Sequence, residues 1–453
     1  MDSTQLPPFP HTITLPPVPH LTHLSALEIL DSRGRPTVKA TVRLASGAAA
    51  SASVPSGAST GAAEAIELRD RDPHRYAGLG CRAAVAHVNG EIAQRLAGRP
   101  WPNQAAVDQT LIALDGTPDK SRLGANALLA TSIAFARAHA RDAGVELHEH
   151  FRAIAAHATS RAAPPSSFIL HPSSFLPRLT INLFSGGKHA GGQVEFQDLL
   201  LVPLAPTIAE GLAQVDAVYR AAEKLIARKY NQRSLKADEG GLAPPFPSVL
   251  EMLADAKEAV EDAGFELGRD VSLAVDVASS HFYRDGLYHW ETVPKSAGDM
   301  IDRLLPLIAR YHIVSVEDAL AEDDWQNWPA LREALKGMGA LTLGDDFLCT
   351  NPTRIRRAID EQCADALLLK VNQIGTLTEA AEALHLARSA NWRVTVSARS
   401  GETEDDWLAD LAVGWSADQI KVGSVRQSER LAKYNRLLEI EAATNWPVVA
   451  WPG

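Results

Sequence analysis

The stretch IVSVEDALAEDDWQNWPALREALKGMGALTLGDD, residues 313–346, decides the fold. It starts with a short β-branched run that ends in acids, continues with a helical pattern, and returns to an apolar run that again ends in acids. A strand, a helix and a second strand in this order form one βα unit of a parallel sheet. The sequence therefore predicts an α/β fold.

The same unit recurs on both sides of this stretch after Thr180. The apolar runs read VSLAVD, IVSVED, LTLGDD, ALLLK, RVTVS and QIKVG, and their ends lie roughly 24 to 41 residues apart. This spacing indicates a parallel sheet, either closed as a barrel or left open. Both architectures place their chemistry at the carboxyl ends of the strands. The residues at these ends are Asp276, Glu317, Asp345, Lys370, Ser397 and Lys421.

Three of these strand ends carry acids, namely Asp276, Glu317 and Asp345. A single acid at a strand end is most simply a helix cap or a salt-bridge partner. Three acids that converge at one rim repel one another unless a cation lies between them. Oxygen ligands without His or Cys favour a hard ion. The sequence therefore predicts a Mg²⁺ site formed by these carboxylates.

Two lysines follow at the ends of later strands. Lys370 comes directly after the apolar run ALLL, which argues against a surface position, and Lys421 ends the last strand. A lysine buried near a metal ion and a second cation is expected to have a lowered pKa, which suits it to act as a base. We therefore expect both lysines in the same site as the three acids.

The composition limits the classes of function. The formal net charge is −11 at pH 7, which disfavours a general binder of nucleic acids or anionic membranes but allows an anionic substrate in a locally cationic cleft. The apolar stretch 127–138 is too short to span a membrane and is expected to be a buried helix. The N-terminus lacks the basic segment of a signal peptide. The cysteines fit no metal-binding spacing, and we expect reduced thiols in a cytoplasmic protein at Cys81, Cys349 and Cys363.

A chain of 453 residues is long enough for two or three domains. Short strands up to about Val54, followed by helical patterns at 84–96 and 124–143, predict a small α+β domain. A later segment rich in Pro, Ser and Ala indicates a linker or insertion loop. We divide the chain into a proline-rich arm at 1–23, the α+β domain at 24–154, the linker at 155–178 and the α/β domain at 179–453.

Across residues 24–440 the chain resembles the enolase family, because a dozen motifs occur in the order in which enolases carry them. They read DSRGRPTV, SVPSGASTG, EAIELRD, LGANALLATS, GGKHAGG, ADEGGLAP, AVDVASS, SVEDALAEDDW, LGDDFLCTNP, LLLKVNQIGTLTEA, SGETED and SERLAKYNRLLEIE. The resemblance implies an N-terminal α+β domain capping a C-terminal enolase-type α/β barrel, in a homodimer or higher homo-oligomer. It also implies a cytoplasmic hydro-lyase of glycolysis that converts 2-phosphoglycerate to phosphoenolpyruvate.

The resemblance implies roles for individual residues. Lys370 matches the base that takes the proton beside the substrate carboxylate, and Glu239 matches the acid that assists departure of the hydroxyl. Asp198 and His189 match two further catalytic residues near them. The first Mg²⁺, which is tightly held, takes Asp276, Glu317 and Asp345, and the second arrives with substrate and takes Ser59 from a glycine-rich lid. A small phosphorylated carboxylate is bound by Gln197, Ser397, Arg399, Ser400 and Lys421.

The chain departs from the family pattern mainly on the side that handles the leaving group. An expected histidine is Ala398, and an expected glutamate is Asp198, one methylene shorter by about 1.5 Å of reach. Smaller departures surround the site at Ser185, Arg35, Ala319 and Gln427. Two further readings are therefore open: a paralogue that acts on an altered carboxylate or phosphonate substrate, and a weakly active or inactive enolase fold kept as a binding or scaffold protein.

Overall fold

The computed structural model describes residues 18–58, 60–158 and 175–451. The first part of the chain forms an antiparallel sheet with the strand order β3-β2-β1-β4. Its strands are β1 (His20–Leu30), β2 (Pro36–Leu44), β3 (Ala49–Ser53) and β4 (Arg99–Pro100). The turn between β1 and β2 is fixed by Asp31, whose carboxylate accepts hydrogen bonds from the backbone N–H groups of Arg33 and Arg35.

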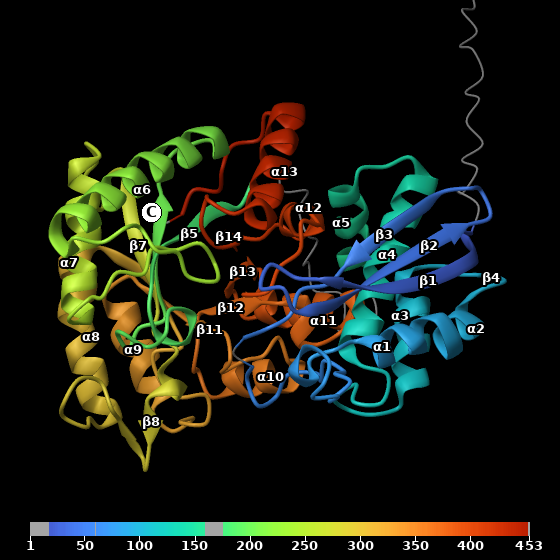
Figure 1. The fold of residues 1–453 in the computed structure, drawn as a ribbon, viewed down its shortest axis with the longest axis horizontal. Helices are drawn as coiled ribbons and strands as arrows, with labels where there is room; N and C mark the ends of the chain where they lie inside the picture. Colours follow the sequence, from blue (N-terminus) through green and yellow to red (C-terminus); the bar gives the residue numbers. More distant parts are fainter. Residues whose placement is uncertain (1–17, 59, 159–174, 452–453) are drawn as a thin grey trace, which may run out of the picture.

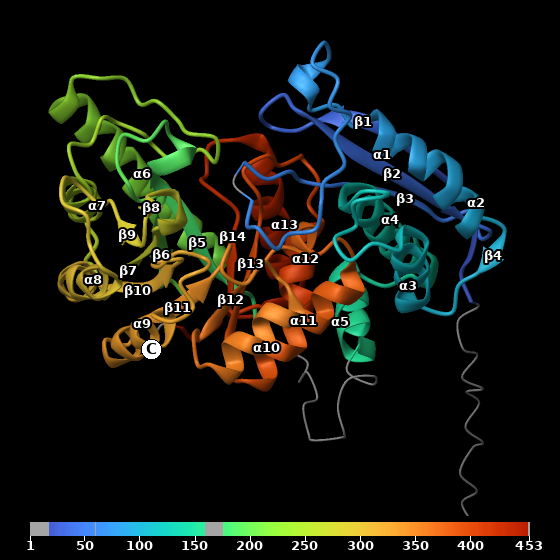
Figure 2. The same ribbon diagram turned by 90° about the horizontal axis from the view of Figure 1, so that it is seen from below.

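Helices cover one face of this sheet. They are α1 (Arg82–His87), α2 (Ala93–Leu96), α3 (Gln104–Asp115), α4 (Ala125–Ala143) and α5 (Leu147–Ala158), and a π-helical turn (Val88–Ile92) joins the first two. α4 packs on β2 and β3, and α5 packs on two helices of the second domain. Figures 1 and 2 show α4 and α5 between the blue strands and the barrel. This two-sided packing explains why α4 is apolar on most of its faces.

The second part of the chain is a closed eight-stranded barrel, ordered β10-β11-β12-β13-β14-β5-β6-β7. Most of its strands are buried along their whole length, as expected for a barrel that helices surround. The strands are β5 (Arg178–Ser185), β6 (Asp198–Pro203), β7 (Val271–Asp276), β10 (Ile313–Glu317), β11 (Leu341–Gly344), β12 (Ala366–Leu369), β13 (Arg393–Ser397) and β14 (Gln419–Lys421). The sequence does not decide between a closed barrel and an open sheet, and the structure shows a closed barrel.

One strand runs against the others. β6 pairs antiparallel with both β5 and β7, whereas the sequence predicts a parallel sheet throughout. The reason is the connection: the loop from β5 to β6 contains only a 3₁₀ turn (Gly187–His189) and no crossover helix, so the two strands form a hairpin. The amino end of β6, at Asp198, consequently lies at the same rim as the carboxyl ends of its neighbours.

The outer helices begin at side-chain caps. Thr207, Ser248 and Thr376 each accept a hydrogen bond from a backbone N–H in the first turn of their helices, and Ser296 forms a capping box with Asp299. The helices are α6 (Ile208–Tyr230), α7 (Val249–Asp262), α8 (Ala297–Tyr311), α9 (Trp328–Gly337), α10 (Pro352–Asp360), α11 (Leu377–Ser389), α12 (Trp407–Gly414) and α13 (Ser428–Thr444). A short ribbon, β8 (Tyr283–Arg284) with β9 (Leu287–Tyr288), precedes α8.

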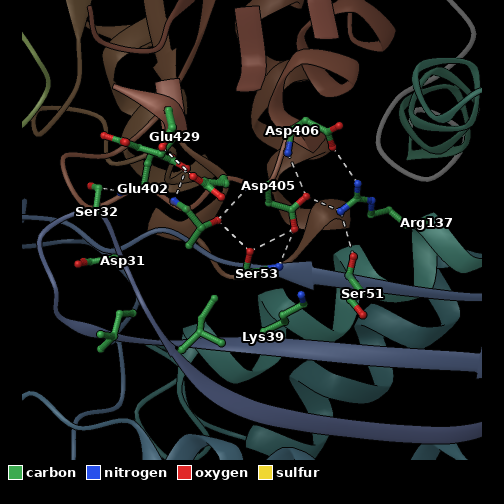
Figure 3. A pocket seen from close by; sticks show the side chains of 15 residues that line it. Asp31, Ser32, Lys39, Ser51, Ser53, Arg137, Glu402, Asp405, Asp406 and Glu429 are labelled. Atoms are coloured by element: carbon green, nitrogen blue, oxygen red, sulfur yellow. Dashed lines mark hydrogen bonds and ion pairs between the residues drawn. The ribbon is translucent and has the colours of Figure 1, made fainter. Parts of the chain in front are cut away.

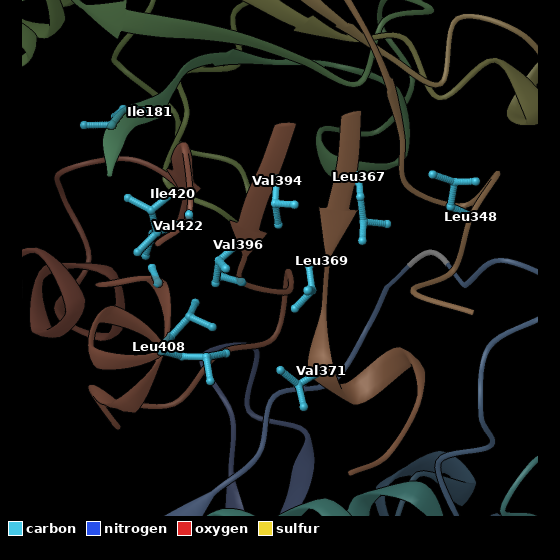
Figure 4. Close-up of a cluster of buried hydrophobic side chains, with 14 of the residues drawn as sticks. Ile181, Leu348, Leu367, Leu369, Val371, Val394, Val396, Leu408, Ile420 and Val422 are labelled. Atoms are coloured by element: carbon cyan, nitrogen blue, oxygen red, sulfur yellow. The ribbon is translucent and has the colours of Figure 1, made fainter. Parts of the chain in front are cut away.

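The layer between the barrel strands and the outer helices is aliphatic. Figure 4 shows Leu367 and Leu369 of β12 beside Val394 and Val396 of β13, with Ile420 of β14 nearby, and all five are fully buried. Successive residues of a strand point to opposite faces, so these side chains point away from the face that carries Lys370 and Lys421 and pack toward the outer helices. Inside the barrel, Leu343, Ala366 and Leu368 form a separate apolar cluster. The polar residues at the strand ends therefore stand on a rigid base.

Three sequence-based boundaries compare with the structure as follows. β1 begins at His20, inside the range assigned to the arm, and α5 and β5 extend into both ends of the segment assigned to the linker. Residues 1–17 and 159–174 of those two segments lie outside the described residues. The stretch 127–138 is a buried part of α4, as predicted, and no described helix is long and apolar enough to cross a membrane.

Candidate active site

A cavity of about 280 Å³ opens at the rim formed by the strand ends. Nearly every residue around it is polar or charged. Its lining consists of His189, Gln197, Glu239, Asp276, Lys370, Ser397, Ala398, Arg399, Ser400 and Lys421. The structure thus brings together most of the predicted site residues. Asp198, Glu317 and Asp345 lie just behind the lining and bond to it, while Ser59 lies outside the described residues.

Two of the predicted carboxylates share one ammonium group. The Nζ of Lys421 lies 3.1 Å from Oδ2 of Asp276 and 2.7 Å from Oε2 of Glu317. Burial opposes the charge on Lys421, but these carboxylates outweigh it and hold the lysine pKa well above its ordinary value. Burial and repulsion from Asp276 raise the pKa of Glu317 well above its usual range. The single positive charge of Lys421 therefore does not neutralise this group of closely spaced carboxylates.

Lys370 is paired with one of the predicted acids. Its Nζ lies 2.5 Å from Oδ2 of Asp345, and its side chain is only 11 % exposed. The lowered pKa that the sequence predicts applies to a lysine beside a bound metal ion, and it stays a prediction. Burial lowers the pKa of Lys370, but the adjacent Asp345 carboxylate outweighs burial and the repulsion from Arg399, so the pKa is raised.

The leaving-group side is built around His189. Its Nδ1 lies 2.8 Å from Oδ2 of Asp198, and its Nε2 lies 3.9 Å from Oε1 of Glu239. Burial disfavours an imidazolium, yet the two carboxylates raise the pKa of His189 to about 9. Burial likewise opposes ionisation of Glu239, but the surrounding cations, His189 foremost, lower its pKa to about 2. Burial raises the pKa of Asp198, although His189 opposes this shift. At neutral pH this face therefore holds an imidazolium beside the carboxylate of Glu239, with Asp198 bonded to its Nδ1.

The cationic side of the cavity is pinned by the N-terminal domain. Arg399 donates hydrogen bonds from Nη1 and Nη2 to the buried carboxylate of Glu64, at 2.8 and 3.3 Å. Arg33 donates from Nη1 to the Oγ of Ser400 at 3.1 Å. Both partners come from segments that follow strands of the small sheet. The small domain therefore orients two of the predicted substrate-binding residues.

Sequence reasoning did not identify several supporting residues. Asn182 donates from Nδ2 to Glu239 at 3.1 Å, and Gln373 donates from Nε2 to Asp345 at 2.9 Å. Arg430, fully buried, donates to the backbone carbonyl oxygens of Arg399 and Ser400. For Asn182, the available signal was a polar residue inside an otherwise apolar strand. The other two lie within the motifs LLLKVNQIGTLTEA and SERLAKYNRLLEIE that the chain shares with the family, and the resemblance was the available signal for them.

The donor set suits a hard cation. Three groups of described residues bring three potential ligand atoms within 4.8 Å of one another. Two of them lie at the site, Asp318 with Asp345 and Asp346, and His189 with Asp198 and Glu239, and the third, Glu146 with His148 and Asp410, lies elsewhere. The predicted trio is not one of these groups; in this structure Lys421 contacts Asp276 and Glu317, and Lys370 contacts Asp345. The first group contains oxygen donors alone, and burial and its own repulsion raise the pKa of Asp346 to about 7. Such a group favours Mg²⁺ over a softer metal.

A second cavity, of about 1120 Å³, lies between the small sheet and residues 402–406. Figure 3 shows Asp405 and Asp406 pointing toward Arg137, with Ser53 bonded to Asp405. These charges are neutralised by one another, so they stabilise the contact between the domains. The cavity contains none of the predicted catalytic residues.

Comparison with known families gives two matches that together cover most of the chain. The model described as "Enolase, N-terminal domain" matches residues 21–151. The model described as "Enolase, C-terminal TIM barrel domain" matches residues 173–447. The two matched ranges correspond to the small α+β domain and to the barrel.

Proposed function

Because the chain belongs to the enolase family, with the lyase-type activity that this membership suggests, we propose that it is a hydro-lyase that dehydrates 2-phosphoglycerate to phosphoenolpyruvate. One observation carries the proposal: a largely buried lysine and a buried imidazolium–carboxylate group stand on opposite sides of one cavity. β12 and β6 are four positions apart in the ring of strands, so Lys370 faces Asp198 across the mouth of the barrel. That arrangement suits removal of a proton and a hydroxyl from opposite faces of a substrate.

The charges of the cavity fit a substrate with a carboxylate and a phosphate. Lys421 and Arg399 supply two buried positive groups, and Lys370, whose side chain is 11 % exposed, supplies a third. The planar guanidinium of Arg399 can bind two phosphate oxygens at once. The guanidinium of Arg399 is now hydrogen-bonded to the carboxylate of Glu64. An incoming phosphate therefore has to displace Glu64 or share the guanidinium with it.

A divalent cation completes this balance. The enolase family typically uses Mg²⁺, and Asp276, Glu317 and Asp345 are the residues that we propose to hold it. The raised pKa of Glu317 supports this proposal, since the carboxylates repel one another when no cation lies between them. When bound, Mg²⁺ neutralises the negative charge that develops on the substrate carboxylate. We propose a second ion that arrives with substrate and takes Ser59.

Different residues of the chain carry out the two steps of the reaction, removal of the proton and loss of the hydroxyl. Lys370 accepts the proton from the substrate carbon beside the carboxylate. It can do so only as a neutral amine, so Asp345, which now stabilises its charged form, has to engage a different cation. The hydroxyl leaves on the side of Glu239 and His189. Gln197 and Lys421 hold Asp276 in place through hydrogen bonds of 3.1 Å each.

A second candidate, an altered carboxylate or phosphonate substrate, is favoured by Ala398. This residue lines the cavity, and its methyl group cannot donate the hydrogen bond that an imidazole there would make. The test is formation of phosphoenolpyruvate from saturating 2-phosphoglycerate with Mg²⁺. A turnover near 10 s⁻¹, ordinary for an enzyme, supports the dehydration. No product, together with normal exchange of the C2 hydrogen with solvent, supports the altered substrate.

A homodimeric assembly and a cytoplasmic location, both expected from the resemblance, stay predictions. The mass in solution, measured by light scattering after size-exclusion chromatography, tests the first. A monomer at micromolar concentration contradicts it.

A further inference from the structure

Ser185, Asp198 and His189 form a closed hydrogen-bonded group on the leaving-group side. The Oγ of Ser185 donates to Oδ1 of Asp198 at 2.6 Å, and the ring of His189 contacts the other carboxylate oxygen, Oδ2, at 2.8 Å. Ser185 and Asp198 are register partners at the end of the β5–β6 hairpin. Both are fully buried, and His189 is nearly so. The group is therefore part of the rigid barrel rim.

These contacts fix which ring nitrogen of His189 is available. An ionised carboxylate only accepts hydrogen bonds, so Nδ1 of His189 carries its proton toward Asp198. The other nitrogen, Nε2, lies 3.9 Å from Oε1 of Glu239, too far for a hydrogen bond. A substrate oxygen located between Nε2 and Oε1 can lie within about 3 Å of both.

The chemistry of the two groups around that position is complementary. The raised pKa of His189, about 9, supports a proton on Nε2. The low pKa of Glu239, about 2, leaves an acceptor. Asn182 bonds the second carboxylate oxygen of Glu239. A hydroxyl between these groups donates its own proton to Glu239 and receives one from His189.

We propose that His189, rather than Glu239 as the family resemblance implies, is the residue that protonates the departing hydroxyl, and that Ser185 is a positioning residue that orients His189 through Asp198. This inference rests on the proposed function. The C2–H electron pair becomes the new double bond while Lys370 takes the proton. The C3–O pair leaves with the oxygen, which takes the Nε2 proton and departs as water. His189 is left neutral, with the remaining proton on Nδ1 and hydrogen-bonded to Asp198, and solvent restores the proton on Nε2.

The proposal also explains the shorter acid in the hairpin. Among the described residues that line the cavity, His189 is the one imidazole, since position 398 is an alanine. An aspartate at 198, with serine at 185, holds that imidazole with both of its carboxylate oxygens engaged. The departures at these positions act together, as one proton-donating group.

The test separates proton removal from loss of the hydroxyl. His189→Gln is assayed for exchange of the C2 hydrogen of 2-phosphoglycerate in deuterated solvent and for phosphoenolpyruvate formation. We expect exchange within about threefold of wild type and elimination lower by about 10²–10³-fold, the size of general acid catalysis. Ser185→Ala is expected to lower elimination about tenfold, in kcat and not in KM, with exchange unchanged. His385→Gln, a half-buried histidine on α11 outside the cavity, is the matched control and should leave both rates unchanged.

The outcomes distinguish the two proposals. If His189→Gln lowers exchange and elimination equally, or lowers neither, the assignment of His189 is overturned while the proposed function stands. Elimination by Asp198→Asn should also begin to decline at a pH below that of wild type, because the imidazolium has lost its carboxylate; an unmoved profile overturns the role of Asp198. If wild-type protein shows no exchange and no elimination, the proposed function fails, and this inference fails with it.

Discussion

The two halves of the active site are built in different ways. The base half takes its acids and lysines from the ends of successive parallel strands between β7 and β14, and each side chain meets a group of opposite charge. The leaving-group half comes largely from one antiparallel hairpin, β5–β6, and depends on Ser185, His189 and Asp198. One half is thus assembled by a repeated unit and the other by a single turn of chain.

The difference teaches where substitutions can be absorbed. In the base half, each carboxylate faces another carboxylate and a lysine, so the loss of any one leaves a buried charge without a partner. In the leaving-group half, proton donation needs one correctly held imidazole, and different side chains can hold it. The departures at Ser185 and Asp198 lie in the hairpin of the second half, whereas those at Ala319 and Ala398 follow strands of the first half without replacing any of its acids or lysines.

The largest effect is expected at the base. Lys370→Ala removes the amine that accepts the C2 proton, and we expect both C2 exchange and elimination to fall by about 10³–10⁴-fold. The two rates are measured as for His189→Gln. Equal loss at Lys370 and unequal loss at His189 would establish the division of the site; retained exchange without Lys370 would break it.

Removal of divalent cations should disable the base half and lower stability. Chelation is expected to abolish elimination, and addition of Mg²⁺ at about 100 times its dissociation constant should raise the free energy of unfolding by about 2.7 kcal/mol. Differential scanning fluorimetry with and without Mg²⁺ measures the shift. Glu317→Gln is expected to reduce the shift. If Mg²⁺ does not change the melting temperature of the wild type, the result would favour an inactive enolase fold kept as a binding or scaffold protein.

The pH dependence of the free energy of unfolding tests the leaving-group half alone. The pKa of His189 is raised from about 6.5 in the unfolded chain to about 9 in the folded protein. Its contribution to stability is therefore fully present below pH 6.5 and lost as the pH rises through 9. It corresponds to about 3 kcal/mol. Urea unfolding of metal-free wild type and His189→Gln between pH 6 and 10 should show the difference shrinking with rising pH; a constant difference would contradict it.

Restoring an imidazole at position 398 sharpens the comparison. If His189 already supplies the proton, Ala398→His should change the turnover of 2-phosphoglycerate by less than about tenfold. Steady-state kinetics measure this directly, with Ala398→Gln as a control of similar size. A rise of a hundredfold or more would show that the leaving-group half is incomplete for this substrate and would favour the altered-substrate reading.

The smallest effect is expected far from both halves. Ser296→Ala removes the capping box of α8 and should lower the free energy of unfolding by about 1 kcal/mol. Exchange and elimination should keep their wild-type rates. A change in either rate would mean that overall stability, rather than local chemistry, governs the measurements proposed for the two halves.

The sequence predicts the base half well because a strand end is a local signal. An apolar run that stops at Asp276, Glu317 or Lys370 carries its own position in the barrel, and the structure has each residue at the end of a strand or just after it. The fold class follows from the same repeats. The closure of the barrel does not, since closure depends on the pairing of β14 with β5, which no local pattern encodes.

The rest depends on contacts distant in sequence. The reversal of β6 follows from the absence of a helix, and short apolar runs look alike in both directions. The partner of Arg399 is Glu64, in the other domain. The raised pKa of Lys370 depends on the 2.5 Å contact with Asp345, a distance that spacing cannot supply. Burial and charge pairing, rather than residue type, decide these features.

The hairpin of β5 and β6 also bears on how such a site changes over generations. Because β6 enters the rim by its amino end, Ser185, His189, Gln197 and Asp198 are encoded within one short stretch of a gene. A single recombination event can exchange that stretch as a cassette, while the base half, scattered from residue 276 to residue 421, is inherited intact. New leaving-group chemistry can therefore be sampled in this barrel without risking its capacity to form a carbanion.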